Sequence, residues 1–259
     1  MTTHNIKFNF ASKNILITGG TSGIGQASAL AFAEAGANVV ITGQNKIQAN
    51  EIIKSSKKLP GNITFISGDI KESRQCNEIV LQTVKTLSGL DIVVNSAGVI
   101  YHGTAEETTD EQWEDTFNVN VHGMFFICRA AIPHLKLKGG TIINIASDAA
   151  LSGSYHLTSY CASKGAVLQM SRAMALDYGK SNIRVVPICP GDVDTPMLRG
   201  EFRDRGINVE IGLKESAENT PLNRVCTPEE VAHMILYASS SSSNFITGYP
   251  LVIDGGGRA

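Results

Sequence analysis

The chain has 259 residues, of which 42% are hydrophobic and 18% charged, and its formal net charge is −2. This length and apolar content suffice for one α/β domain with a large core, whereas the near-neutral charge argues against a nucleic-acid surface, which needs a basic excess. The amino-terminal stretch lacks the apolar core of a signal peptide and no later run approaches the roughly 18 apolar residues of a membrane span, so we expect a cytoplasmic protein that binds a small molecule.

Short β-branched runs alternate with longer helical stretches along the chain. The strand candidates span residues 15–18, 38–42, 63–67, 92–95, 141–146, 183–189 and 251–253. These apolar runs are continuous rather than alternating, which is typical of strands covered on both faces. The pattern predicts an α/β fold with a parallel sheet between helices. No internal repeat or low-complexity linker interrupts it, so a single domain over residues 1–259 suffices.

A glycine-rich turn follows the first strand candidate and precedes a helical run at 26–35. Gly19, Gly23 and Gly25 would let the backbone approach a pyrophosphate, whose charge would lie near the start of that helix. The spacing G-x-x-x-G-x-G differs from the G-x-G-x-x-G dinucleotide fingerprint, so a purely structural turn is the alternative. Its position at the first strand–helix junction favours the dinucleotide site.

Two later helices have marked starts. Thr227, Pro228 and Glu230 form the pattern of a capping threonine, a first-turn proline and a third-position glutamate, and Thr109 with Gln112 resembles a second capping box. We therefore expect helices to begin directly after Thr109 and Thr227.

Tyr160 and Lys164 are four residues apart, and Ser147 follows the strand candidate at 141–146. If a helix starts near Thr158, the phenol and the ammonium share one face. A neighbouring cation stabilises a phenolate and lowers its pKa, which would let Tyr160 exchange a proton with a substrate oxygen. Taken alone, the pair could also be an ordinary exposed helix pair.

The five cysteines are widely spaced and contain no C-x-x-C pair. That pattern argues against a disulfide framework and a zinc site, so no metal is expected. We interpret them as reduced cysteines, several of them buried. They are Cys76, Cys128, Cys161, Cys189 and Cys226.

The ordered motifs of the chain resemble those of the single-domain short-chain dehydrogenase/reductase family. They are TGGTSGIG at 18–25, NSAG at 95–98, NVN at 118–120, Ser147, YCASK at 160–164 and PG at 190–191. The resemblance runs from about residue 13 to residue 257. It implies a doubly wound Rossmann-type fold with a seven-stranded parallel sheet, NAD or NADP as cofactor, and a homotetramer.

The resemblance also implies roles for single residues. Tyr160 would act as general acid or base, Lys164 would lower its pKa and bind the nicotinamide ribose, and Ser147 would bind the substrate oxygen. Asn120 would hold water in a proton relay; its structural alternative is to satisfy backbone groups, as that of Ser147 is to cap a strand. The implied cofactor contacts are Gly19, Thr21, Ser22, Gly23, Ile24, Gly25, Gln44, Asp69, Ile70, Asn95, Ala97, Gly98, Tyr160, Lys164, Pro190, Gly191, Val193 and Thr195.

Some positions near the cofactor depart from the family's motifs. Ser96 replaces the second asparagine of NNAG, and Val186 replaces an asparagine after Ile-Arg-Val. At the end of the second strand, residues 42–45 contain no acid that would bind the ribose 2′-hydroxyl and repel a 2′-phosphate. This favours NADP, although Gln44 stands where NADP-using relatives often have arginine and Lys46 is the nearest cation.

Residues 196–223 are implied to form a two-helix substrate lid. Its mixed side chains fit a sugar or polyol, a small cyclic ketone, or a 3-oxoacyl chain on a carrier protein. Its arginines could dock an acidic carrier or could be solvated. His102, His156 and Asp148 could line the substrate pocket, but solvated loops are the favoured interpretation.

The leading hypothesis is an NAD(P)(H)-dependent oxidoreductase that interconverts a secondary alcohol and a ketone. Within the family, a 3-oxoacyl-carrier-protein reductase is the alternative. A non-catalytic dinucleotide-sensing protein is the alternative of another class, against which the complete set of Asn120, Ser147, Tyr160 and Lys164 counts. An epimerase or dehydratase with transient hydride transfer is a third, although such relatives have longer chains and a different glycine spacing.

Overall fold

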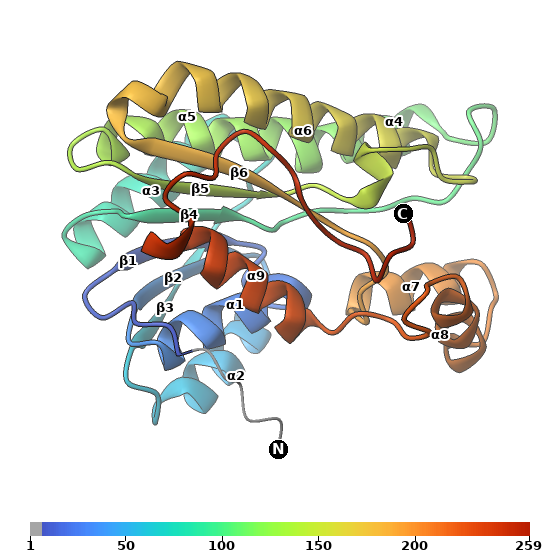
Figure 1. Cartoon of the computed structure of the whole chain (residues 1–259), viewed down its shortest axis with the longest axis horizontal. Helices are drawn as coiled ribbons and strands as arrows, with labels where there is room; N and C mark the ends of the chain where they lie inside the picture. Colours follow the sequence, from blue (N-terminus) through green and yellow to red (C-terminus); the bar gives the residue numbers. More distant parts are fainter. Residues whose placement is uncertain (1–6) are drawn as a thin grey trace.

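The computed structural model describes residues 7–259, so residues 1–6 of the amino-terminal stretch considered above lie outside it. In the described chain, seven strands form one sheet in the order β3-β2-β1-β4-β5-β6-β7, and all neighbours are parallel (Figure 1). The strands are β1 Asn14–Thr18, β2 Asn38–Gly43, β3 Asn62–Ser67, β4 Ile92–Asn95, β5 Gly140–Ile145, β6 Ile183–Pro190 and β7 Leu251–Ile253. The predicted α/β, doubly wound Rossmann-type sheet is confirmed.

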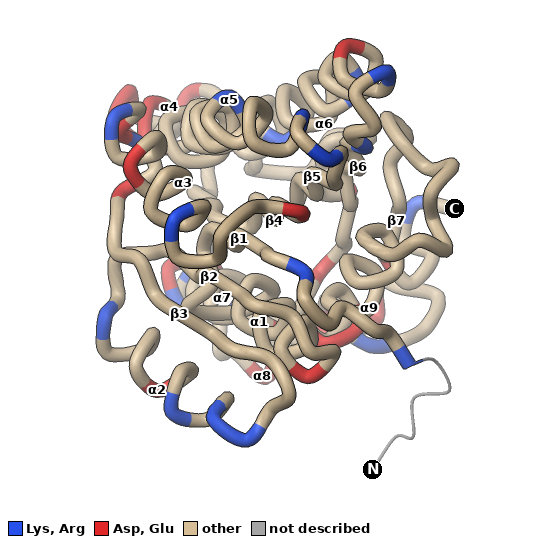
Figure 2. Tube along the Cα trace, turned by 90° about the vertical axis from the view of Figure 1, so that its left-hand side faces the viewer, with Lys and Arg blue, Asp and Glu red and all other residues tan. Residues whose placement is uncertain are grey.

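Helices cover both faces of this sheet (Figures 1 and 2). Successive strand residues point to opposite faces, so Ile15 and Ile17 join one core while Leu16 joins the other. The first core includes α1, α2 and α9, and the second includes α3, α5 and α6. The helices are α1 Gly23–Glu34, α2 Lys46–Ser56, α3 Ser73–Leu87, α4 Asp110–Phe117, α5 Met124–Leu135, α6 Thr158–Tyr178, α7 Pro196–Asp204, α8 Val209–Glu218 and α9 Pro228–Ser239.

Both predicted capping boxes are present. At the start of α9, the Thr227 hydroxyl accepts a hydrogen bond from the Glu230 amide at 3.3 Å, and the Glu230 carboxylate accepts one from the Thr227 amide at 2.9 Å. Each bond satisfies an amide that the helix itself leaves free.

Thr227→Ala is therefore expected to lower the free energy of unfolding by about 1 kcal/mol, because it removes the capping oxygen and leaves one helix amide without that partner. Denaturant unfolding checks this, with Thr227→Ser as the control that keeps the oxygen. Equal midpoints for the alanine variant and the parent would contradict the stabilising role of the cap.

The cysteine side chains are free thiols. Cys76, Cys128 and Cys189 are buried, and burial raises the pKa of Cys76 and Cys128 to about 12 and that of Cys189 to about 11. Over residues 7–259, no group of histidine, cysteine or acidic side chains could hold a metal ion. None of the helices in this range has the length and apolar content needed to cross a bilayer.

Candidate active site

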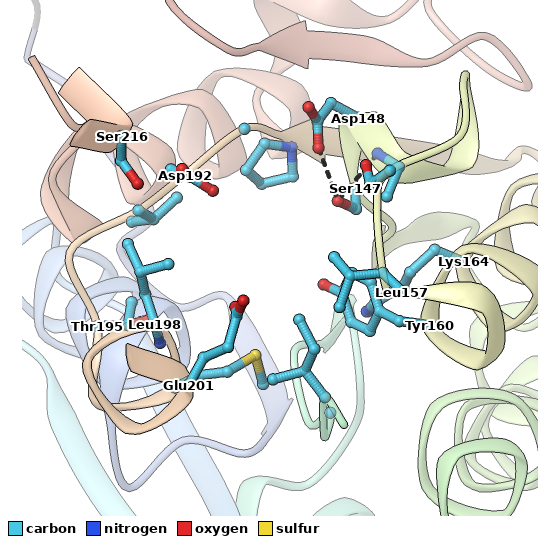
Figure 3. Close-up of a pocket in the computed structure, with 18 of the residues that line it drawn as sticks. Ser147, Asp148, Leu157, Tyr160, Lys164, Asp192, Thr195, Leu198, Glu201 and Ser216 are labelled. Atoms are coloured by element: carbon cyan, nitrogen blue, oxygen red, sulfur yellow. Dashed lines mark hydrogen bonds between the residues drawn. The ribbon is translucent and has the colours of Figure 1, made fainter. Parts of the chain in front are cut away.

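A cavity of about 740 Å³ lies at the carboxyl ends of β1, β4, β5 and β6. In a doubly wound sheet, ligands bind outside the carboxyl ends of the strands, where the strand order reverses. Residues of α7 and α8, within the segment 196–223, line the side opposite β5 and α6 (Figure 3).

The glycine turn forms one end of this cavity. Gly19 and Gly23 have φ angles of +63° and +50°, in the left-handed region that favours glycine. Ser22 precedes α1 and its side chain makes no capping hydrogen bond, so it leaves the first amides of the helix available to an anion. A Cβ at Gly19 would lie 2.7 Å from the Ala97 Cα atom. These features fit the pyrophosphate of a dinucleotide.

Most residues implied to contact the cofactor line the cavity. They are Gly19, Ser22, Gly23, Ile24, Ala97, Gly98, Tyr160, Lys164, Pro190, Gly191, Val193 and Thr195. Thr21, Gly25, Gln44, Asp69, Ile70 and Asn95 lie outside its lining. Gly25 shapes the turn, since a Cβ there would lie 2.2 Å from the Gly19 carbonyl oxygen.

The side chain of Asn95 is engaged inside the protein. Its side chain is buried, and its amide nitrogen donates to the Asn144 side-chain oxygen at 2.9 Å and approaches the Cys128 sulfur at 3.2 Å. Asn144 belongs to the neighbouring strand β5 and Cys128 to α5, which packs on the sheet. The Asn95 side chain therefore supports the sheet beneath the cavity, and the cofactor contact implied for this residue stays a prediction.

Ser147 follows the end of β5 and lines the cavity. Its oxygen accepts from the Ala149 amide at 3.1 Å and its hydroxyl donates to Asp148 at 3.0 Å. Asp148 in turn accepts from the Arg258 guanidinium at 3.0 Å. Ser147 thus caps a short turn and also faces the cavity. Asp148, for which a solvated loop was the favoured interpretation, is half-buried and lines the cavity.

Tyr160 and Lys164 lie on one helical face, as predicted, since α6 begins at Thr158. Lys164 is 5% exposed, and its ammonium donates to the Ile145 carbonyl at 2.9 Å. The same nitrogen lies 5.5 Å from the centroid of the Tyr160 ring. The ammonium therefore stands over the face of the ring and holds the end of β5.

The pKa values of this pair differ from the sequence-based expectation. Burial raises the pKa of Tyr160, a hydrogen bond with Ser147 partly offsets this, and the nearby Asp148 and Glu201 raise it further. Burial lowers the pKa of Lys164 to about 8. These contributions outweigh any lowering by the Lys164 ammonium, which lies over the ring and donates to a backbone carbonyl.

Asn120 lies in a π-helical turn, Asn118–Gly123, between α4 and α5. Its amide nitrogen donates to the Val99 carbonyl and the Ser163 hydroxyl, both at 3.0 Å, and its oxygen accepts from the Val99 amide at 2.8 Å. The side chain thus satisfies backbone groups, which was the structural alternative. A Cβ at Gly98 would lie 3.2 Å from the Asn120 oxygen, so the amide also supports the loop beside the cavity.

Several cavity residues were missed by sequence reasoning. Asp192 directly follows the Pro-Gly motif, which was a usable signal, and Glu201 lies in the predicted lid. Ser216 also lines the cavity and lies in the same lid, whereas no local pattern marked Arg258. The rings of His102 and His156 stack with centroids 4.9 Å apart but lie outside the lining.

A parallel Rossmann-type sheet, a glycine turn that fits an anion, and a serine, a tyrosine and a lysine thus meet at one cavity. The family model described as Enoyl-(Acyl carrier protein) reductase matches residues 19–257. The chain belongs to the short-chain dehydrogenase/reductase family, and it is an oxidoreductase of that family.

Individual relatives agree with this assignment. An uncharacterised oxidoreductase of Thermotoga maritima is 38% identical over 97% of this chain and 99% of its own length. A 3-oxoacyl-[acyl-carrier-protein] reductase of the same organism is 33% identical over 94% of this chain and 97% of its own. The solved structure of ElxO with NADP bound superposes with a TM-score of 0.86 at 31% identity, over 94% of this chain and 98% of that one.

Proposed function

We propose that the protein interconverts a secondary alcohol and a ketone with a nicotinamide cofactor, and that Tyr160 moves the proton. The observation that carries this proposal is the convergence of Ser147, Tyr160 and Lys164 on one cavity beside the glycine cradle. In Figure 3 the Tyr160 hydroxyl points into the hollow, on the same side as Ser147. A carbonyl oxygen placed between the two hydroxyls would receive two hydrogen bonds.

Each residue has a defined task in this proposal. The bound cofactor supplies the hydride. Ser147 turns its hydroxyl from Asp148 to the substrate oxygen, where it stabilises developing negative charge. Tyr160 keeps its proton at neutral pH, since its pKa is raised, and donates it to that oxygen during reduction. Lys164 places a positive charge over the face of the Tyr160 ring. The helices α7 and α8 close over the substrate.

The test is a substrate screen with keto acids, ketoses, cyclic ketones and 3-oxoacyl thioesters, followed by the absorbance of the reduced nicotinamide. Net conversion of cofactor in proportion to product supports the proposal. Tight cofactor binding without turnover on any substrate would instead support a dinucleotide sensor, and turnover without net cofactor conversion would support an epimerase or dehydratase.

A second candidate is a 3-oxoacyl-carrier-protein reductase, which the relative from Thermotoga maritima favours. Docking an acidic carrier protein would need free basic side chains near the cavity mouth. Arg199 pairs with Asp194 and Glu210, and Arg205 pairs with Glu201. Because two of the three arginines in the segment 196–223 are already engaged, we place this candidate second.

NADP is expected to bind more tightly than NAD. The exposed Gln44 and Asn45 follow β2, and Asn45 caps α2. No acidic side chain at this strand end would therefore repel a 2′-phosphate. Titration of both cofactors by intrinsic fluorescence or calorimetry checks this. NAD binding more than about tenfold tighter, roughly 1.4 kcal/mol, would overturn the preference.

We also propose a homotetramer. Large exposed apolar side chains support a self-association surface, notably Trp113 and Phe125 on α4 and α5, and Phe245 and Tyr249 before β7. Size-exclusion chromatography with light scattering tests this, and a monomer at micromolar concentration would contradict it.

A further inference from the structure

The side of the cavity that faces Ser147 and Tyr160 is rich in hydrogen-bond acceptors. Asp192 comes from the turn after β6, Glu201 from α7 and Ser216 from α8. Figure 3 shows the carboxylates of Asp192 and Glu201 directed into the hollow, across from the two catalytic hydroxyls. A substrate whose carbonyl oxygen lies at Tyr160 would extend toward these carboxylates.

The Glu201 carboxylate has few partners within the protein. Its side chain is 12% exposed, and over residues 7–259 the one hydrogen bond recorded for it comes from Arg205 to a single oxygen at 3.4 Å. Burial raises the pKa of Glu201; Arg205 lowers it by its charge and its hydrogen bond, and the nearby Asp192 raises it. A recessed carboxylate with one long hydrogen bond is costly to desolvate, so this group is suited to receive further hydrogen bonds from a ligand.

Asp192 is in a similar position. It is accessible to solvent through the cavity, yet the protein around it raises its pKa by desolvation, and the nearby Asp148 adds to this effect. A hydrogen bond with Ser216 and the charge of Arg258 act in the opposite direction. Asp192 and Glu201 therefore repel each other across a space that a ligand would share, and donors placed between them would relieve that repulsion.

The charges around this space select among ligand classes. A second anionic group on the substrate would face Asp192 and Glu201, while the guanidinium of Arg205 is held by Glu201 and that of Arg258 by Asp148. A cationic group would be attracted by the two carboxylates but would also lie beside those two guanidinium groups and the Lys164 ammonium, which line the same cavity. A purely apolar chain would desolvate the carboxylates and give them no donor. A neutral ligand with several hydroxyl donors meets none of these penalties, because each carboxylate oxygen can accept from a hydroxyl.

We propose that the substrate is a polyhydroxylated alcohol or ketone, a polyol or ketose, whose hydroxyls beyond the reacting carbon bind Asp192 and Glu201. This inference rests on the proposed function, since it takes Tyr160 and Ser147 as the groups that hold the reacting oxygen. Asp192 and Glu201 then determine specificity, and the hydride and proton steps are those already described.

The test compares fructose and sorbitol with cyclohexanone and an acetoacetyl thioester, each with NADP(H) and NAD(H). A site built to bind hydroxyls rejects an analogue that lacks them, so we expect kcat/KM for fructose to exceed that for cyclohexanone by about a hundredfold or more. Glu201→Gln and Asp192→Asn keep side-chain shape and remove the charge. Each is expected to raise KM for fructose by about tenfold and to change kcat/KM for cyclohexanone by less than about twofold.

Glu218→Gln is the matched control, because Glu218 lies on α8, is exposed and pairs with Lys214. It is expected to leave both substrates unaffected, and circular dichroism confirms that each variant is folded. Efficient turnover of cyclohexanone or the thioester without turnover of fructose or sorbitol would overturn the inference and keep the proposed function. Fructose turnover that neither variant weakens would also overturn it. Failure of every substrate in the broader screen would overturn the proposed function itself.

Discussion

Tyr160→Phe is expected to abolish turnover while leaving cofactor affinity unchanged. The substitution removes one hydroxyl and keeps the ring on which the Lys164 ammonium rests. Without the hydroxyl, Tyr160 can no longer donate a proton, and of the two proposed hydroxyls only that of Ser147 still binds the substrate oxygen. Positioned general acids contribute about a hundredfold to ten-thousandfold to a rate, and we expect kcat to fall by about a thousandfold.

Steady-state kinetics and cofactor titration together check this expectation. Tyr178→Phe is a matched control, since Tyr178 is the last residue of the same helix and lies against Lys136, away from the cavity. A Tyr160→Phe enzyme whose activity stays within about threefold of the parent would refute the acid–base assignment. Parallel loss of cofactor binding would show that the hydroxyl also serves the cofactor site.

Lys164→Met is expected to lose activity and to change the pH dependence of stability. Burial lowers the pKa of Lys164 to about 8 from its ordinary 10.5. Between these values the unfolded chain keeps a proton that the folded chain has released, so the stability of the parent rises with pH in this range. The difference amounts to roughly 2 to 3 kcal/mol by pH 10, and the methionine variant lacks it.

Denaturant unfolding at pH 7 and pH 10 gives the free energy of unfolding of both proteins. The contributions of the other titrating groups cancel when the values of the variant are subtracted from those of the parent. The parent should gain stability relative to the variant as the pH rises. Below pH 8 both states of the parent hold the proton, and the folded one carries a buried charge that the variant avoids. Parallel curves for the two proteins would show that Lys164 is not desolvated in the folded chain.

The sheet was predictable because its strands bury both faces. Three successive apolar residues begin the run at 92–95, and β4 occupies the same positions between two layers of helices. The other strands match their predicted runs to within one residue at each end. The helix that places Tyr160 beside Lys164 was predictable for the same kind of reason, since spacing alone decides which residues share a helical face.

Side-chain direction in the site was less predictable, because it depends on partners far along the chain. Asn95 turns to Asn144, which is 49 residues away, and Asp148 is held by Arg258, 110 residues away. The π-helical turn that carries Asn120 has no sequence pattern of its own. Local spacing therefore identified the groups that we propose to act on the substrate oxygen, whereas the groups proposed to bind the rest of the substrate are brought together only by the folded chain.

The alkylation rates of the buried cysteines would measure how the molecule unfolds. Thiolates react with alkylating reagents and thiols do not, and a pKa of about 12 leaves almost no thiolate on Cys76 or Cys128 while the fold is closed. Cys76 lies on α3, Cys128 on α5 and Cys189 within β6. The order in which a maleimide labels these residues would report whether the layer of α3 and α5 detaches before the sheet separates.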